Sequence, residues 1–250
     1  MARQRYRQPP VVEALCEVYF AGSQWDDTVP GRFYDAVKGE FPKRQQMVVL
    51  ETETKVAASG EISTSVRPQR PRIRFLSDSE RQIVQIGEGI LVVNQLPPYP
   101  SFDEWAPVVE RMIGLYGEIA RPATATQVAV RYINRISFAE QQVRMEDWFG
   151  VYPEVPESLG RAHGAFMLRL ELPARQPDEH VLLTFGSAPP EPPATVAHLL
   201  DIYVRTQVPV GSGLGAVMPV VRRAQDEAER VFEATLTDHL RERFQPETTT

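Results

Sequence analysis

Cysteine, lysine and long apolar runs are almost missing from this chain of 250 residues. Its single cysteine, Cys16, excludes a disulfide within the chain and fits a reducing compartment. The sequence contains no run of about 18 apolar residues, the length needed to cross a bilayer. Its basic N-terminal residues are not followed by the apolar stretch of a secretory signal. We therefore expect a cytoplasmic protein with no membrane span. We also expect Cys16 to be a buried structural thiol, because it occupies an apolar position of a predicted strand.

Recognisable catalytic and metal-binding motifs are missing too. The four histidines are scattered, without H-E-x-x-H or paired Cys/His spacing, and no G-x-S-x-G elbow occurs. Residues 211–216 (GSGLGA) match G-x-G-x-x-A. A dinucleotide site needs a second strand with an acidic residue after the helix, whereas this helix runs nearly to the C-terminus. We predict no metal and no cofactor, and a non-enzymatic protein rather than an enzyme.

The charged residues are acidic in balance but rich in arginine. The formal net charge is −6, which argues against general nucleic-acid binding. Only three of the 27 basic residues are lysine. Arginine suits bidentate recognition of carboxylates and phosphates, although a codon bias toward arginine, proline and alanine explains the same excess.

Two segments show the alternation of a half-buried strand. Residues 127–138 (QVAVRYINRISF) place apolar side chains on one face and Arg131 and Arg135 on the other. Residues 11–20 alternate in the same way, with Glu13 and Glu17 on the polar face. Further strands are expected at residues 47–50, 72–76, 82–86, 90–96, 166–172, 180–185 and 198–206.

The outward positions of these strands carry most of the interest. They are Glu13, Glu17, Arg72, Arg74, Arg131, Arg135, Arg169, Glu171, Asp201 and Arg205. If all lie on one side of a single sheet, six arginines face four acids. Two interpretations stay open: a solvated lattice of weak cross-strand ion pairs, or a groove that binds an anionic or peptide ligand. For the second, the candidate binding residues are Arg72, Arg74, Arg131, Arg135, Glu13 and Glu17.

Two asparagines occupy positions where apolar residues are expected. Asn134 lies on the apolar face of its strand, and Asn94 precedes a proline-rich turn. A buried amide must be hydrogen-bonded. We predict that both are structural ties to the backbone of a neighbouring loop.

Helix signals divide the chain into two similar parts. A short helix is expected after residues 27–30, a long one behind the capping box Ser101-x-x-Glu104, and another over residues 216–244, with a second cap at 235–238. In residues 1–138 we expect a strand, a helix, an antiparallel meander, a long helix and a strand, in that order. Residues 139–161 are expected to be a connector whose aromatic residues pack on the sheet edge. Residues 162–250 are expected to form three strands and a long helix. Residues 52–71 read as a polar excursion or hairpin.

The predicted fold class is α+β, with a large antiparallel sheet and long helices packed on one face. Two similar halves forming a continuous sheet, in one domain or two, is the finer form of this prediction.

Several short motifs resemble a sporadically distributed family of uncharacterised bacterial proteins of about this length. They are PPVVEA at 9–14, RF at 74–75, VQ at 84–85, NQL at 94–96 with PY at 98–99, RYINR at 131–135, LDI at 200–202 and VFE at 231–233. The resemblance implies a bacterial origin and a shared fold. Its sporadic distribution suggests a stress or defence setting, but it transfers no mechanism.

The leading hypothesis is a non-enzymatic binding or protein-interaction module that uses the charged sheet face or a groove beside it. Its partner would be another protein or an anionic ligand. One alternative is a hydrolase or nucleotide-processing enzyme that uses Glu13 and Glu17 with nearby arginines. Another is a structural protein that self-associates as a homo-oligomer.

Overall fold

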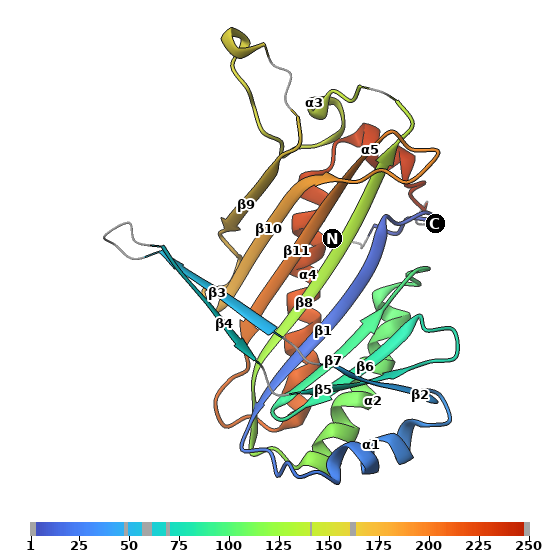
Figure 1. Cartoon of the computed structure of the whole chain (residues 1–250), viewed down its shortest axis with the longest axis vertical. Coiled ribbons are helices and arrows are strands. Elements are labelled where there is room, and N and C mark those ends of the chain that lie inside the picture. Colours follow the sequence, from blue (N-terminus) through green and yellow to red (C-terminus); the bar gives the residue numbers. More distant parts are fainter. Residues whose placement is uncertain are drawn as a thin grey trace.

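The computed structural model describes residues 4–47, 50–56, 62–68, 71–140, 142–160 and 164–247. It confirms the α+β class and the large antiparallel sheet (Figure 1). The strands are β1 (Val11–Ala21), β2 (Lys43–Met47), β3 (Leu50–Val56), β4 (Ile62–Pro68), β5 (Arg72–Leu76), β6 (Gln82–Gly87), β7 (Ile90–Gln95), β8 (Thr124–Phe138), β9 (Met167–Leu172), β10 (Glu179–Ala188) and β11 (Val196–Gln207). The helices are α1 (Val29–Val37), α2 (Phe102–Ala120), α3 (Met145–Trp148), α4 (Val217–Thr235) and α5 (Asp238–Arg243), with 3-10 turns η1 (Glu157–Leu159) and η2 (Leu214–Ala216).

Nine strands form one sheet in the order β2-β5-β6-β7-β1-β8-β11-β10-β9. The two segments with the clearest alternation, β1 and β8, pair with each other near its centre. Their apolar positions lie in the main core, and Cys16 is only 1% exposed there. Burial raises the pKa of the Cys16 thiol, which therefore stays protonated, as expected for a structural residue.

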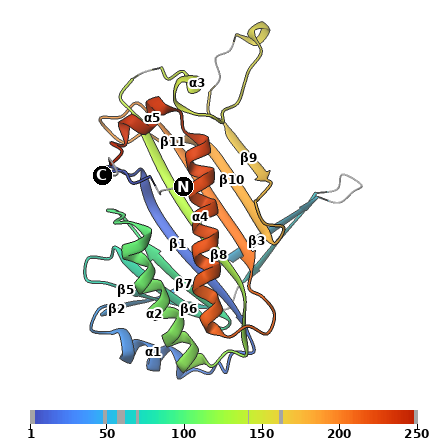
Figure 2. The same cartoon turned by 180° about the vertical axis from the view of Figure 1, so that it is seen from behind.

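The two long helices pack against the middle of the sheet. α4 lies on β8 and β11, and α2 contacts β7 (Figure 2). The predicted N-cap is confirmed, since Ser101 Oγ accepts from Glu104 N at 3.2 Å. Glu104 Oε1 accepts from the Ser101 hydroxyl at 3.1 Å, whereas in a full capping box it would accept from the Ser101 backbone N–H. The expected second cap is present as well: α4 ends at Thr235, and Thr237 Oγ1 accepts from Leu240 N at 3.4 Å to begin α5.

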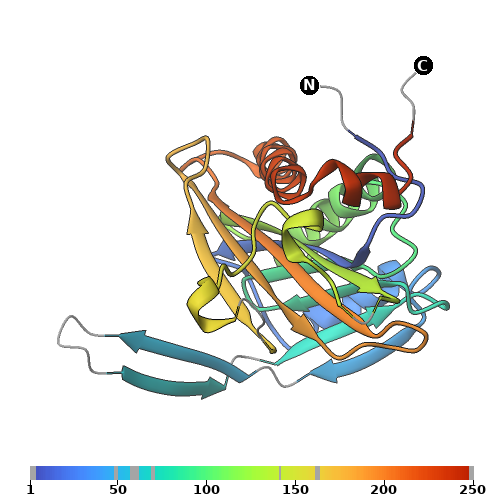
Figure 3. The same ribbon diagram turned by 90° about the horizontal axis from the view of Figure 1, so that it is seen from above.

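The expected polar excursion is a hairpin, at least in its described residues. β3 and β4 form a separate two-stranded sheet that projects on the side of the main sheet opposite to α2 and α4 (Figure 3). Of the strand expected at 47–50, residues 48 and 49 lie outside the described residues, as do residues 57–61 and 69–70 of the excursion.

The connector differs from expectation in where its aromatic residues pack. Phe149 is 1% exposed and lies in the main core, with its ring centroid 4.7 Å from that of Phe185, rather than on the sheet edge. Trp148 stacks on His239 of α5 at 3.9 Å. Phe149 also contacts Phe138 and His198, so the connector adds an aromatic ring to the main core.

Within the described part of the chain, no helix combines the length and the apolar character that a bilayer crossing requires.

Candidate functional site

The strand register places all ten charged outward positions on one side of the nine-stranded sheet. Residues directly opposite in an antiparallel pair share a face. Arg131 lies opposite Leu15 of β1 and Tyr203 of β11, and Arg74 lies opposite Gln85 of β6. This side, which we call the open face, is the one turned away from α2 and α4 (Figure 3).

The charges at the centre of the open face are satisfied within the chain. Arg131 binds Asp201 bidentately, with Nε–Oδ1 at 2.8 Å and Nη2–Oδ2 at 2.5 Å. This hydrogen bonding raises the pKa of Arg131 despite partial burial. Glu17 accepts from the hydroxyl groups of Tyr19 at 3.1 Å and Tyr203 at 3.3 Å. Burial and the Glu17 charge raise the pKa of Tyr19, and they raise the pKa of Tyr203 to about 12. Both tyrosine hydroxyl groups therefore keep their protons at neutral pH and can donate to Glu17.

Beside the centre of the open face, a row of hydrogen-bonded polar side chains links three adjacent strands, β6, β7 and β1. Gln85 donates to Asn94 Oδ1 at 2.9 Å, and Asn94 Nδ2 donates to Glu13 Oε1 at 2.7 Å. Asn94 is 3% exposed and therefore ties side chains together rather than a loop backbone. Asn134, 1% exposed on the opposite face, donates to the carbonyl oxygen of Leu200 at 3.1 Å. Its tie is therefore to the backbone of the neighbouring strand β11 and not to a loop.

The six candidate binding residues do not converge on one pocket. Arg135 donates to the carbonyl oxygen of Pro189 and lies 3.3 Å from Glu191, so a loop holds it. Arg74 has a buried Nε with no hydrogen-bond partner in the described structure. It lies on β5, four strands from Arg131 on β8. At about 4.8 Å between strands, roughly 19 Å separates the two arginines.

The open face has a hollow near the edge of the sheet that is formed by β11, β10 and β9, at the opposite end from β2 and β5. This hollow, the edge hollow, has a volume of about 640 Å³. Its charged lining consists of Arg169, Glu171, Glu179, His180 and Arg205, with Tyr203 beside them. Glu179 points to the core; the other four make no hydrogen bond or ion pair with any described residue, in contrast to the paired charges at the centre of the face.

The sequence signal for the edge hollow was present but incomplete. Arg169, Glu171 and Arg205 were recognised as outward positions but not as binding residues. His180 and Tyr203 were missed, although each lies at an outward position of its strand. Alternation assigns a residue to a face, whereas the hollow depends on the β9–β10 loop that walls it.

Neither carboxylate of the enzymatic alternative lines the edge hollow. Glu13 and Glu17 lie on β1, and their oxygens accept hydrogen bonds from Asn94 and two tyrosines. Among the described residues, no group of three or more His, Cys, Asp or Glu could hold a metal ion. In the described part of the chain, these two carboxylates are thus engaged on the flat centre of the open face and not in the edge hollow.

No model of a known protein family matches the chain, and no curated protein is significantly similar to it.

Proposed function

We propose that this protein is a non-enzymatic binding module whose edge hollow binds an acidic segment of a partner protein. The observation that carries the proposal is the difference between the two parts of the open face. Charges at its centre are paired within the chain, whereas Arg169 and Arg205 in the hollow are not. The lining also has a histidine and two glutamates, of which Glu179 is paired with Arg223. The two unpaired arginines therefore favour a ligand with carboxylates.

The surroundings of the hollow resemble a protein-binding surface. Tyrosine and arginine are enriched in the centres of protein interfaces, and Tyr203, Arg169 and Arg205 provide both. The side chain of Tyr203 is held by Glu17, so little conformational freedom would be lost on binding.

We further infer that the sheet consists of two similar halves with long helices on one side. In each half a long strand is followed by antiparallel strands of the sheet and a long helix: β1, then β2-β5-β6-β7 and α2, and β8, then β9-β10-β11 and α4. The first half has one strand more than the second, and the β3–β4 hairpin is inserted between β2 and β5. The long strands β1 and β8 pair at the junction. This arrangement would leave the open face available to a partner across both halves.

Charge reversal in the edge hollow tests the proposal directly. We expect Arg169→Glu combined with Arg205→Glu to weaken binding of a fluorescein-labelled octaglutamate peptide at least about tenfold, since two attractive contacts become repulsive. Fluorescence anisotropy measures the dissociation constant, and raising NaCl should weaken wild-type binding because exposed charges are screened.

The matched control is Arg32→Glu combined with Arg81→Glu, which makes the same charge change at exposed positions outside the hollow. It should bind the peptide nearly as well as the wild type. The proposal is wrong if the wild type does not bind octaglutamate, or if the two double variants lose the same amount of affinity for it.

Self-association is a second candidate function, favoured by the projecting β3–β4 hairpin. In the described part of the chain each of these strands pairs only with the other. A lone two-stranded hairpin is marginally stable in water, and its open edges can pair with another strand. A second copy of the chain would provide such an edge.

Removing the hairpin tests self-association without disturbing the main sheet. Met47 and Arg72 are directly paired, so Asn-Gly in place of residues 48–71 would join β2 to β5 by a two-residue turn. We expect light scattering to give a mass above that of one chain for the wild type and one chain for the shortened variant. Circular dichroism checks that the shortened variant is folded. An unchanged mass on shortening, or a monomeric wild type, contradicts this candidate.

A further inference from the structure

The strand β9 forms one end of the nine-stranded sheet, beside the edge hollow (Figure 1). It pairs with β10 in an antiparallel register that runs without a shift from Met167, opposite Gly186, to Leu172, opposite Val181. Among the described strands, none pairs with its other side, which we call the outer edge. The edge strand of a sheet presents unpaired N–H and C=O groups to which a further extended chain can bond.

The backbone groups that β9 turns outward follow from its hydrogen bonds to β10. Ser187 N donates to the carbonyl oxygen of Phe166 at 3.0 Å, so these two residues form a hydrogen-bonded pair. Bonded and non-bonded pairs alternate along an antiparallel ladder. The even-numbered residues of β9 therefore bond to β10, whereas the N–H and C=O groups of Met167, Arg169 and Glu171 point outward. Within the described residues, no hydrogen bond reaches these outward groups.

The outer edge lacks the features that commonly prevent a sheet from gaining a strand. Lysine, proline, a bulge or a very short strand usually provides this protection. β9 is six residues long (MLRLEL), contains neither lysine nor proline, and has no bulge. Its two charged side chains, Arg169 and Glu171, have opposite signs. The outer edge can therefore accept a strand whose own charges match these two.

Both faces of β9 present side chains that an added strand would contact. On the open face, Arg169 lines the edge hollow and pairs with no described residue, and Met167 is 80% exposed. On the other face, Leu168, Leu170 and Leu172 are only half-buried. Apolar side chains of a neighbouring strand would remove these leucines further from water.

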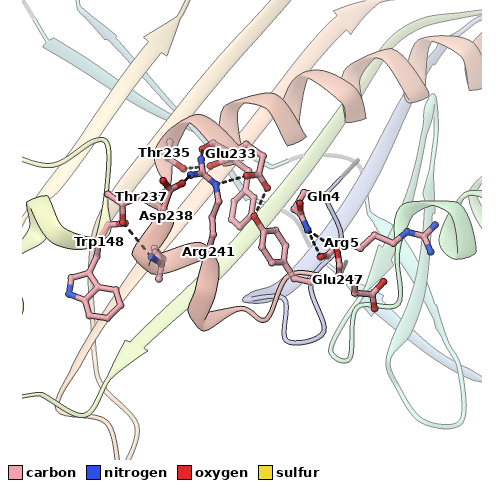
Figure 4. Close-up of polar contacts among 12 residues, drawn as sticks. Gln4, Arg5, Trp148, Glu233, Thr235, Thr237, Asp238, Arg241 and Glu247 are labelled. Carbon is pink, nitrogen blue, oxygen red and sulfur yellow. Dashed lines mark hydrogen bonds and ion pairs between the residues drawn. The ribbon is translucent and has the colours of Figure 1, made fainter. Parts of the chain in front are cut away.

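The described ends of this chain are bonded elsewhere and do not supply the missing strand (Figure 4). Glu247 N donates to the carbonyl oxygen of Arg5 at 2.8 Å, and Gln4 Nε2 donates to the carbonyl oxygen of Glu247 at 3.4 Å. The Tyr6 hydroxyl donates to Glu233 Oε1 of α4 at 2.8 Å. Since α4 packs on β8 and β11, these segments lie away from the outer edge.

We propose that the acidic segment of the partner protein binds as an added strand along the outer edge of β9, antiparallel to it. This inference rests on the function proposed above and specifies how the segment is held. Its backbone would bond to the outward groups of β9. An acidic residue would lie opposite Arg169, a neutral one opposite Glu171, and apolar residues beside the leucines. The partner segment would therefore alternate between polar and apolar residues.

Two fluorescein-labelled peptides of identical composition test this pairing. VTVEVEV alternates in the required way, whereas TEEVVVV does not. By fluorescence anisotropy we expect the alternating peptide to bind at least about tenfold more tightly. Equal affinity of the two peptides overturns the proposal.

Methylation of the peptide backbone tests the hydrogen bonds without any change in the protein. In the proposed pairing, the amide N–H groups of the threonine and the glutamates face β9, and those of the valines face away. N-methylation of the first set should abolish binding of the alternating peptide, whereas N-methylation of two valines should not. The same loss in both methylated peptides contradicts strand addition.

Glu171→Pro separates backbone pairing from charge. Because the Glu171 N–H points outward, proline keeps the bonds of β9 to β10 but removes the donor and places ring atoms in its position. We expect the alternating peptide to bind at least about tenfold more weakly, although loss of a negative charge by itself favours an acidic peptide. Glu171→Gln removes the same charge and keeps the N–H, and it should bind at least as tightly as the wild type.

Gln46→Pro is the matched control on β2, the strand at the opposite end of the sheet. Ser77 N donates to the carbonyl oxygen of Gln82 at 3.0 Å, so by the same alternation Ile73 bonds to β6. Gln46 lies opposite Ile73 and turns its N–H outward. This variant should bind the alternating peptide like the wild type, and circular dichroism checks that both proline variants are folded.

The outcomes distinguish this inference from the function on which it rests. If wild-type protein binds octaglutamate but folded Glu171→Pro keeps full affinity for the alternating peptide, strand addition is wrong and the acidic-ligand proposal stands. Binding of neither peptide by the wild type rejects both. If light scattering shows a dimer that Glu171→Pro converts to a monomer, a second copy of the chain occupies the outer edge and the partner segment is rejected.

Discussion

Arg223→Leu is expected to destabilise the protein by about 3 kcal/mol at pH 8, because it leaves a buried carboxylate without its cation. Glu179 is 1% exposed in its side chain, and its Oε1 lies 2.8 Å from Arg223 Nε. The angle is not that of a hydrogen bond, so the contact is an ion pair. Arg223 also binds Asp178 Oδ2, which adds a second carboxylate to the same cation.

The loss should depend on pH in a defined direction. Burial raises the pKa of Glu179 although Arg223 opposes this. A carboxyl with a raised folded-state pKa favours folding most below its unfolded value of about 4.3, and that contribution is lost as pH rises through the folded value. Without Arg223 the folded pKa rises further. Urea unfolding should therefore show a large loss of stability at pH 8 and a smaller one at pH 5.

Two further variants separate this explanation from simple loss of packing. Adding Glu179→Gln to Arg223→Leu should recover much of the stability at pH 8, since no buried charge remains. Arg222→Leu, at the adjacent exposed position, should cost under about 1 kcal/mol, the value of its contact with the Phe102 ring. The same loss at both pH values would contradict the assignment to Glu179.

Phe185→Ala is expected to cost about 3–5 kcal/mol, the usual range for truncating a buried aromatic residue. Phe185 is fully buried, and its ring contacts those of Phe149 at 4.7 Å, Phe166 at 5.3 Å and His198 at 5.6 Å. Phe149 belongs to the segment between β8 and β9. Chemical denaturation measures the loss, and limited proteolysis should cleave this segment faster because one of its anchors is lost.

The control for this truncation is Leu159→Ala in the same segment. Leu159 is 74% exposed, so its removal should change stability by no more than about 0.5 kcal/mol. If Phe185→Ala unfolds more easily but proteolysis of residues 142–160 is unchanged, Phe149 does not anchor the segment.

The sequence predicted most strands because each carries its own local pattern. The strand expected at 47–50 was placed wrongly, since Met47 ends the polar strand β2 and Leu50 begins β3. Alternation in β1 and β8 placed Cys16 and Asn134 in the interior and Glu17 and Arg131 outside, and burial agrees. The capping box at Ser101 predicted the start of α2, since the capping residues are local in sequence.

Partners across strands could not be predicted in this way. Asn94 was expected to bind a loop but binds Glu13, which lies 81 positions away in sequence. β8 lies between β1 and β11 in the sheet, and its Arg131 pairs with Asp201 of β11 rather than with either glutamate of β1. Such contacts depend on strand order and register, which the period of two does not encode.

The sequence by itself determined the class of this protein: an α+β chain with an antiparallel sheet and charged residues on the outward positions of its strands. Side-chain alternation and helix caps are local, so they can be recognised without tertiary contacts. Only the tertiary structure decided which charges are paired, where the open face is hollowed, and which backbone groups β9 turns outward at the edge of the sheet. These features arise where distant segments meet, and their chemistry depends on burial that no local pattern specifies.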